Sequence, residues 1–216
     1  MQPLRVLEVG TWEGNSACWL ASHVACQEED ELVCVDSFAG SAEHLKCEVY
    51  AKDLKDLEAR CRRNLARAAA AEGGAGRVRL LKDLSHSALS SLQVSLEAQE
   101  EQAFDLIYID GSHEWEHVLE DARLAWPLLR AGHDGRNAGG LLIFDDYLWH
   151  GAKCPHFAPH PVLVGALVGA CGGEKAVEER NENCRCPGRA IDAFVQALQG
   201  SVRVVSVNYQ VALEKL

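Results

Sequence analysis

The sequence predicts an α/β fold: a doubly wound, mostly parallel β-sheet with helices on both faces. Short, nearly all-apolar segments alternate with segments of helical composition, which is typical of buried parallel strands joined by helices. Several of the apolar segments are followed directly by a glycine or an acidic residue. The length of 216 residues suits one domain. We therefore expect a single domain over residues 1–216, with a variable insert at about 150–188.

The amino-terminal half is predicted to contain three strands and two helices. Apolar runs predict strands at residues 4–9, 32–35 and 78–81. Apolar residues at helical spacing predict a first helix over residues 14–26. Residues 43–71 are rich in Ala, Leu, Lys, Glu and Arg, which are good helix formers, and the glycines that follow end this second helix.

The carboxyl-terminal half continues the alternation of strands and helices. Apolar residues recur every three or four positions over residues 114–130, which predicts an amphipathic helix, and a further helix is predicted at 190–198. Apolar runs predict the remaining strands, which are residues 104–109, 141–144, 202–207 and 209–213.

Charge and composition exclude several classes of protein. A formal net charge of −11 argues against nucleic acid as a partner, because nucleic-acid phosphates attract basic surfaces. The longest apolar run, ten residues at 162–171, is shorter than the roughly 20 residues of a membrane span. Nine cysteines include no CxxC pair, and the first residues carry no basic and apolar leader. We therefore expect a soluble, cytoplasmic protein that does not bind membranes.

Acidic residues and glycine gather where the predicted strands end. Right-handed connections place the carboxyl ends of parallel strands along one edge of the sheet, where ligands of such folds bind. The first strand ends near Glu8 and Gly10, and three later strands are followed by acids: Asp36, Asp110 and the pair Asp145–Asp146. The sequence therefore predicts a ligand site at this edge.

The turn after the first strand is a GxxxG loop, from Gly10 to Gly14, with Thr11 and Trp12 inside it. Gly10 permits a sharp turn and a close approach of a ligand to the backbone. The loop lacks the GxGxxG spacing of dinucleotide-binding turns, and Glu8 would repel a diphosphate. It therefore suits a nucleoside that bears a cationic group.

Asp36 is the second candidate contact for a nucleoside. It ends the second strand and precedes Ser37. A carboxylate at this position can accept hydrogen bonds from both ribose hydroxyls. The alternative is that Asp36 caps a helix, but the glycine loop ahead of it favours the ribose.

Seven sequence segments together carry a family resemblance. They cover most of the chain and read LEVGTWEGNSACWL, VCVDSF, LLKDLSHSAL, FDLIYIDGSHEWEHVLEDARLAWPLL, GGLLIFDDYLW, AIDAFVQAL and NYQVALEK. With them the chain resembles class I S-adenosylmethionine-dependent methyltransferases, of the small metal-assisted O-methyltransferase type that includes the macrocin and catechol O-methyltransferase-like families. The FDLIYIDGSH and GGLLIFDDY segments are the most specific of these motifs.

The resemblance implies a Rossmann-like methyltransferase fold with a seven-stranded sheet, whose last strand runs antiparallel. It implies S-adenosylmethionine as the cofactor. It also implies that the turn Asp83-Leu84-Ser85 lies near the adenine. The full set of implied cofactor-binding residues is Glu8, Gly10, Thr11, Trp12, Gly14, Asp36, Ser37, Asp83, Leu84, Ser85 and Asp110.

The chain departs from this family pattern around the expected substrate pocket. Little sequence precedes the first strand, where relatives often carry helices that close the site or build a dimer. Residues 133–137 look inserted, and the segment 150–188 is hard to match. The sequence leaves a homodimer open as the assembly. It also leaves the acceptor open among catechols, other phenols, sugar hydroxyls and carboxyls, and does not exclude methylation of nitrogen.

Three carboxylates are predicted to hold a divalent metal ion. Asp110, Asp145 and Asp146 follow two strands that are neighbours in the implied order, and crowded carboxylates raise one another's pKa unless a cation neutralises them. Oxygen ligands suit Mg²⁺ or another hard divalent ion. Adjacent strand residues point to opposite faces, so Asp145 and Asp146 share an ion only where the strand has ended. The alternative is that Asp145 caps the next turn and Asp146 is solvated.

The predicted reaction moves a methyl group from S-adenosylmethionine to a hydroxyl of a small molecule. A bound metal ion lowers the pKa of that hydroxyl. His113 and Asp110 are the catalytic candidates, and His113 is the best general base because histidine titrates near neutrality. His113 is equally consistent with a capping role or with an outer contact to an aspartate. Trp149, beside the acids, is a candidate for the wall of a substrate pocket or for the core.

Two other functions compete with methyl transfer as hypotheses for this sequence. An NAD(P)-dependent oxidoreductase is disfavoured by the missing GxGxxG motif and by the carboxylate cluster. A non-catalytic nucleoside-binding module on the same fold is disfavoured because Asp110, His113, Asp145 and Asp146 are all present.

Overall fold

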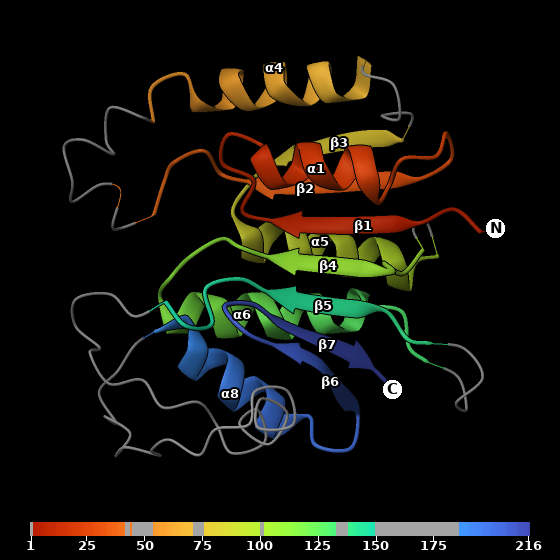
Figure 1. Ribbon diagram of the computed structural model, residues 1–216, viewed down its shortest axis with the longest axis vertical. Coiled ribbons are helices and arrows are strands. Elements are labelled where there is room, and N and C mark those ends of the chain that lie inside the picture. Colours follow the sequence, from red (N-terminus) through yellow and green to blue (C-terminus); the bar gives the residue numbers. More distant parts are fainter. Residues whose placement is uncertain are drawn as a thin grey trace.

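The computed structural model describes residues 2–41, 44, 54–70, 76–99, 102–132, 138–149 and 186–216. Within these residues, seven strands form one sheet in the order β3-β2-β1-β4-β5-β7-β6 (Figure 1). They are β1 (Arg5–Val9), β2 (Glu31–Asp36), β3 (Arg77–Lys82), β4 (Leu106–Ile109), β5 (Leu141–Phe144), β6 (Val202–Val207) and β7 (Val211–Lys215). The neighbours among β1 to β5 pair in parallel, whereas β7 runs antiparallel to both β5 and β6. The predicted fold class and the antiparallel last strand are confirmed.

Helices cover both faces of the sheet, as the alternating pattern predicted. The helices are α1 (Asn15–His23), α4 (Leu57–Ala70), α5 (Ser85–Glu97), α6 (Trp115–Ala125), the 3₁₀ turn η1 (Trp126–Leu128) and α8 (Pro187–Ala197). Helices α1 and α4 contact each other on one face, and α5, α6 and α8 pack side by side on the other (Figure 1).

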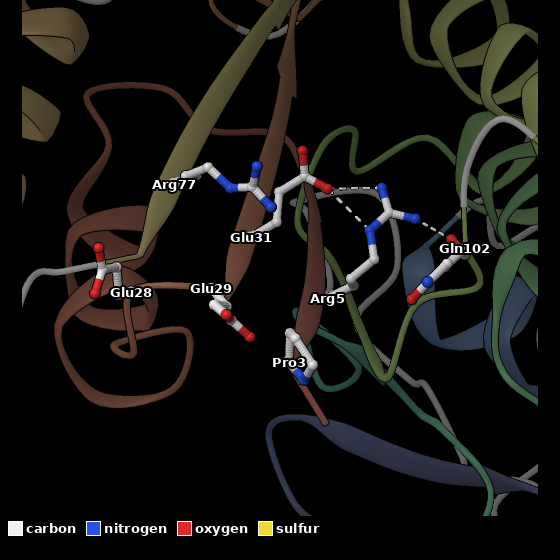
Figure 2. Close-up of a pocket in the computed structure, with 7 residues that line it drawn as sticks. All are labelled: Pro3, Arg5, Glu28, Glu29, Glu31, Arg77 and Gln102. Carbon is white, nitrogen blue, oxygen red and sulfur yellow. Dashed lines mark hydrogen bonds and ion pairs between the residues drawn. The ribbon is translucent and has the colours of Figure 1, made fainter. Parts of the chain in front are cut away.

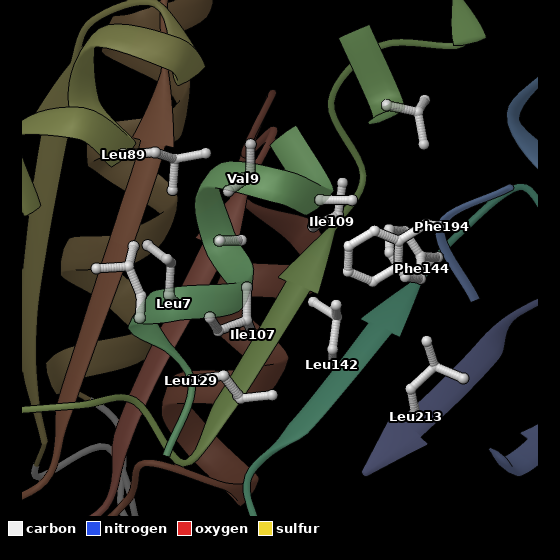
Figure 3. Close-up of a cluster of buried hydrophobic side chains, with 14 of the residues drawn as sticks. Leu7, Val9, Leu89, Ile107, Ile109, Leu129, Leu142, Phe144, Phe194 and Leu213 are labelled. Atoms are coloured by element: carbon white, nitrogen blue, oxygen red, sulfur yellow. The ribbon is translucent and has the colours of Figure 1, made fainter. Parts of the chain in front are cut away.

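The core lies on both sides of the sheet because successive strand residues point to opposite faces. In β1, Val6 joins the apolar cluster under α1 and α4, while Leu7 and Val9 join the larger cluster under α5, α6 and α8. Figure 3 shows this larger cluster, in which Phe144 of β5 meets Phe194 of α8. Burial on both faces explains why the strands read as continuous apolar runs.

The structure corrects several predicted boundaries. The helix predicted at 114–130 ends at Ala125 and continues as η1, where Pro127 cannot donate a backbone hydrogen bond. The strand predicted at 104–109 begins at Leu106, and Phe104 instead forms an isolated bridge with Leu129. The last strand begins at Val211, because the preceding residues form the turn from β6.

One helix was missed entirely. Helix α5 buries Ala88, Leu89 and Leu92 against the sheet, a spacing that marks one helical face and that the sequence analysis did not use. Only the second half of the helix predicted at 43–71 can be compared, as α4, because most of residues 43–53 lie outside the described part of the chain. Residues 133–137 and nearly all of the predicted insert at 150–188 also lie outside it. None of the described helices is both long and apolar enough to span a bilayer.

Candidate active site

The carboxyl ends of five parallel strands meet at one edge of the sheet and carry the predicted site residues. The glycine loop follows β1, Asp36 ends β2, Asp83 follows β3, and acids follow β4 and β5. Because β7 runs in the opposite direction, the turn between β6 and β7 reaches the same edge (Figure 1). The turn between the last two strands therefore brings to the site residues that lie nearly 200 positions after the glycine loop in the sequence.

Gly10 is required by the backbone itself. Its φ is 91°, and a Cβ added there would lie 2.0 Å from the carbonyl oxygen of Asp110, a distance that no side chain can adopt. Its backbone nitrogen donates to the carbonyl of Val35 at 2.9 Å. The glycine therefore lets the loop after β1 pack directly onto the chain leaving β4.

Asp36 holds the glycine loop in shape. Its carboxylate accepts hydrogen bonds from the backbone nitrogens of Thr11 at 2.9 Å and Trp12 at 2.7 Å, and from Phe38 at 2.6 Å. Trp12 has a φ of 51°, an uncommon conformation for a bulky side chain, which these bonds stabilise. Asp36 thus organises the backbone, while its contact with a ribose stays a prediction. The predicted alternative, a helix cap, stays open, because most of residues 42–53, which follow Asp36, lie outside the described part of the chain.

A pocket of about 400 Å³ opens beside this loop. Seven of the predicted cofactor-binding residues line it, namely Gly10, Trp12, Asp36, Ser37, Asp83, Leu84 and Ser85. The start of α5 and the loop between β4 and α6 complete its wall. The ring of Trp12 stacks on His44, with 4.4 Å between centroids, at one end of the pocket. The structure thus brings together residues from the ends of three strands, as the fold prediction required.

Four of the predicted cofactor contacts do not line the pocket, namely Glu8, Thr11, Gly14 and Asp110. Glu8 is fully buried, Thr11 is 2% exposed, and Gly14 packs against Cys61. Burial raises the pKa of Glu8 to about 7, although Ser16, Thr11 and Cys34 nearby lower it and Asp36 repels it. None of these neighbours meets hydrogen-bond geometry, so neither carboxylate oxygen has a partner. Glu8 is therefore a buried acid that does not line the pocket.

The chemical end of the site is a hydrogen-bonded group of acids, tyrosines and one histidine. His113 Nε2 lies 2.9 Å from Asp146 Oδ2, and the Tyr209 hydroxyl donates to Asp146 Oδ1 at 2.6 Å. Burial raises the pKa of Asp146, but the bonds from His113 and Tyr209 outweigh it and leave the pKa below its usual value. Asp145 accepts a hydrogen bond from the Tyr108 hydroxyl. The His113 ring lies against Trp149, with 4.4 Å between ring centroids.

The three predicted metal ligands lie near one another but do not form a closed metal site. Burial and repulsion from Asp145, Asp146 and Glu8 raise the pKa of Asp110 to about 8, so these charges act on a common region. Strand β5 ends at Phe144, and Asp146 has a φ of 57°. Asp145 and Asp146 therefore lie outside the strand, so their side chains need not point to opposite faces of the sheet. Among the described residues, however, no three His, Cys, Asp or Glu side chains are grouped closely enough to hold a metal ion.

Two tyrosines and a glutamine in this group were missed by the sequence analysis. Tyr108 lies within β4, and Tyr209 and Gln210 lie in the turn between β6 and β7. The Gln210 amide donates to the Tyr108 hydroxyl at 3.1 Å. The available signal was the predicted antiparallel last strand, because a hairpin turn before it must lie at the carboxyl edge.

A larger hollow of about 760 Å³ lies at the opposite edge of the sheet. Figure 2 shows its charged lining, where Arg5 pairs with Glu31 and bonds the carbonyl of Gln102. The Arg5–Glu31 contact is 2.7 Å, so these opposite charges are already matched. Ligands of parallel sheets bind at the carboxyl edge, and this hollow lies at the amino edge.

Comparisons with known proteins point to one family. The methyltransferase domain family matches residues 7–147 of this chain. No curated protein matches the chain in sequence.

Solved structures of methyltransferases share the fold. The O-methyltransferase from Bacillus cereus in complex with SAH is 20% identical, with a TM-score of 0.52 and coverage of 98% of this chain and 74% of that chain. The O-methyltransferase TomG from Streptomyces achromogenes, in complex with SAM, is 19% identical, with a TM-score of 0.55 and coverage of 100% and 74%. MycE of the mycinamycin biosynthetic pathway, in complex with Mg and SAH, is 17% identical with a TM-score of 0.50, and the match covers 99% of this chain but 45% of MycE.

Proposed function

The chain belongs to the methyltransferase domain family, and we propose that it transfers a methyl group from S-adenosylmethionine to a hydroxyl of a small molecule. The observation that carries this proposal is the pocket of about 400 Å³ at the carboxyl edge, lined by residues that follow β1, β2 and β3. Ser112, which lines the pocket, directly precedes His113, whose Nε2 lies 2.9 Å from Asp146 Oδ2. The two O-methyltransferases described above carry SAH or SAM on the same fold.

The pocket suits a nucleoside that carries a positive charge. Leu84 is 53% exposed and presents an apolar side chain to the pocket, where a flat base can pack. Asp36 lines the pocket, and two further acids lie close to it: burial raises the pKa of Glu8 to about 7 and that of Asp110 to about 8. A bound sulfonium favours the ionised form of nearby acids, whereas a diphosphate disfavours it. The bound donor supplies the methyl group.

His113 acts as the general base that accepts the proton of the acceptor hydroxyl. As the oxygen attacks the methyl carbon, its O–H proton passes to the imidazole, and the carbon–sulfur electron pair stays on sulfur to leave a neutral thioether. Asp146, 2.9 Å from His113 Nε2, orients the ring and stabilises the imidazolium that forms. Trp149 packs against the same ring and fixes its position. The remaining contribution of the chain is to hold the two reactants at attack distance.

Metal assistance is part of the proposal, through Asp110, Asp145 and Asp146. The donor set suits a hard divalent ion such as Mg²⁺ because it is made of carboxylate oxygens. Burial, and then repulsion from Asp145 and Asp146, raises the pKa of Asp110 to about 8. A bound ion there would lower the pKa of an acceptor hydroxyl. The described side chains do not form a group of three around one point, and Asp145 and Asp146 already contact Tyr108 and His113.

A methyl-transfer assay tests the proposal. Labelled S-adenosylmethionine is incubated with a library of phenols, catechols and sugars in the presence of Mg²⁺, and S-adenosylhomocysteine and the methylated product are quantified. We expect transfer to oxygen for at least one acceptor. Replacing His113 by alanine should lower the rate by about 10²–10⁴-fold.

A matched control distinguishes the loss of the general base from a general effect of replacing any histidine by alanine. His23 is the last residue of α1, does not line the pocket and stacks on Trp19. His23→Ala should leave the transfer rate unchanged. Absence of S-adenosylhomocysteine with every hydroxyl acceptor, or exclusive methylation of nitrogen, would contradict the proposed reaction.

A further inference from the structure

The carboxyl end of the glycine loop is bound by helix α4, through contacts that the proposed reaction does not use. The side-chain amide of Asn64 donates a hydrogen bond to the backbone carbonyl of Glu13 at 2.9 Å. The carboxylate of Glu13 pairs with Arg60, one turn earlier on α4, at 2.7 Å. Helix α1 begins with a hydrogen bond to the carbonyl of Gly14, so the carbonyl of Glu13 lies outside the hydrogen bonds of that helix. Its partner therefore comes from α4.

The loop and α4 also pack closely around Asn64. A Cβ added to Gly14, the last residue of the loop, would lie 3.3 Å from Cys61 Sγ and 3.6 Å from a side-chain carbon of Leu65. Asparagine is a weaker helix former than alanine, yet Asn64 lies in the middle of a helix that otherwise consists of Leu, Glu, Ala, Arg and Cys. The bond to the loop accounts for an asparagine at this position.

The loop requires this support because part of its backbone is strained. Trp12 has a φ of 51°, and a bulky residue keeps this conformation only where its surroundings fix it. The carboxylate of Asp36 binds the backbone nitrogen of Trp12 at 2.7 Å, and Asn64 binds the carbonyl of the next residue. The strained segment is therefore fixed at both ends, from β2 at one end and from α4 at the other.

The strained segment belongs to the pocket wall, whereas Asn64 does not. Gly10 and Trp12 line the pocket, and the ring of Trp12 stacks on His44 at one end of it. Within the described part of the chain, no residue of α4 lines this pocket. Without the bond from Asn64, the backbone at Trp12 would relax toward an ordinary φ, and the ring would leave its place in the wall. Asn64 therefore acts on a bound ligand only through the loop.

We propose that Asn64 is a positioning residue for the methyl donor, because it fixes the glycine loop in the conformation that binds S-adenosylmethionine. This inference rests on the proposed function, since it assumes that the donor occupies the pocket. Through the carbonyl of Glu13, α4 contributes to donor affinity without contacting the donor. The loop is ordered before the donor arrives, so binding does not bear the cost of ordering it.

Calorimetric titration with S-adenosylhomocysteine tests the inference on two variants. Asn64→Ala removes the amide, and Asn64→Asp keeps the size of the side chain but replaces the donating amide by an accepting carboxylate. Each variant loses the hydrogen bond that fixes the loop. Both should therefore bind S-adenosylhomocysteine on the order of 3- to 10-fold more weakly than the wild-type chain.

Gln93→Ala is the matched control. Gln93 lies on α5 and does not line the pocket, and its side-chain amide donates to the backbone carbonyl of Leu124 at 3.1 Å. The control therefore loses a hydrogen bond of the same kind and should keep the wild-type affinity.

Urea unfolding supplies a readout that distinguishes positioning from a merely structural role. Alanine is the better helix former, which offsets the lost bond, so the urea midpoint of Asn64→Ala should stay near that of the wild-type chain while its affinity falls. A merely structural role predicts the opposite result, a lower midpoint with unchanged affinity.

The outcomes separate this inference from the proposed function. If S-adenosylhomocysteine does not bind the wild-type chain, both are overturned. If it binds and Asn64→Asp keeps the wild-type affinity, the donated hydrogen bond is not required, and only the role of Asn64 is overturned. Should Asn64→Ala fail to fold, Asn64→Asp, which leaves no cavity, decides the question by the same comparison.

Discussion

Replacing Glu8 by glutamine should stabilise the protein at neutral and alkaline pH but not in acid. Glu8 is fully buried under the glycine loop, and burial raises its pKa from 4.5 to about 7. Below pH 4.5 the group is protonated in both the folded and unfolded states and makes no pH-dependent contribution. Between these two values the unfolded chain releases the proton and the folded chain keeps it, so stability falls by about 1.4 kcal/mol for each pH unit. Above pH 7 the accumulated loss is about 3 kcal/mol.

Urea unfolding followed by circular dichroism measures this effect at pH 5 and pH 8. The free energy of unfolding of Glu8→Gln minus that of the wild-type chain should be larger at pH 8 than at pH 5 by about 2–3 kcal/mol. Glu97→Gln, an exposed substitution at the end of α5, serves as the matched control and should give no such pH dependence. A Glu8→Gln difference that is the same at both pH values would refute the view that Glu8 is an unpaired buried acid.

Three further predictions concern the site. Asp36→Ala removes the acceptor of three backbone hydrogen bonds, and calorimetry should show affinity for S-adenosylmethionine lowered by about 10- to 100-fold, whereas unchanged affinity would contradict its place in the pocket. Tyr209→Phe removes one bond to Asp146, so steady-state kinetics should show kcat lowered by about tenfold, and an equal loss of donor affinity would count against this role. EDTA should abolish turnover while calorimetry still detects donor binding, and Mg²⁺ should restore it; full turnover in excess EDTA would show that the carboxylates do not hold a required ion.

The fold was predictable because local pattern and burial agree along most of the chain. The strand predicted at 141–144 matches β5, and the strand predicted at 202–207 matches β6. An apolar run bounded by polar residues determines where a buried strand begins and ends. The predicted boundaries are wrong where two local sequence signals favour different structures. The periodic apolar pattern continues past Pro127, although proline ends the regular helix, so the pattern alone predicted too long a helix for α6.

The candidate site was predictable only where one strand end determines a residue's position. Gly10 and Asp36 follow their strands directly and lie in the pocket, as predicted. Tyr209 reaches Asp146 across 63 positions of sequence, through a hairpin whose strand pairing no local pattern specifies. Asp121 is one of several acids on α6, and only the packing of that helix against the sheet makes it a buried group in the pocket wall.

The central claim is that the pocket at the carboxyl edge binds S-adenosylmethionine, and a calorimetric titration of the wild-type chain tests it most directly. The chain is titrated separately with S-adenosylmethionine and with NADH, each in the presence of Mg²⁺. The account predicts saturable binding of one S-adenosylmethionine per chain and no binding of NADH, because the loop after β1 lacks the diphosphate-binding spacing and lies over the buried acid Glu8. Binding of NADH without binding of S-adenosylmethionine would contradict it.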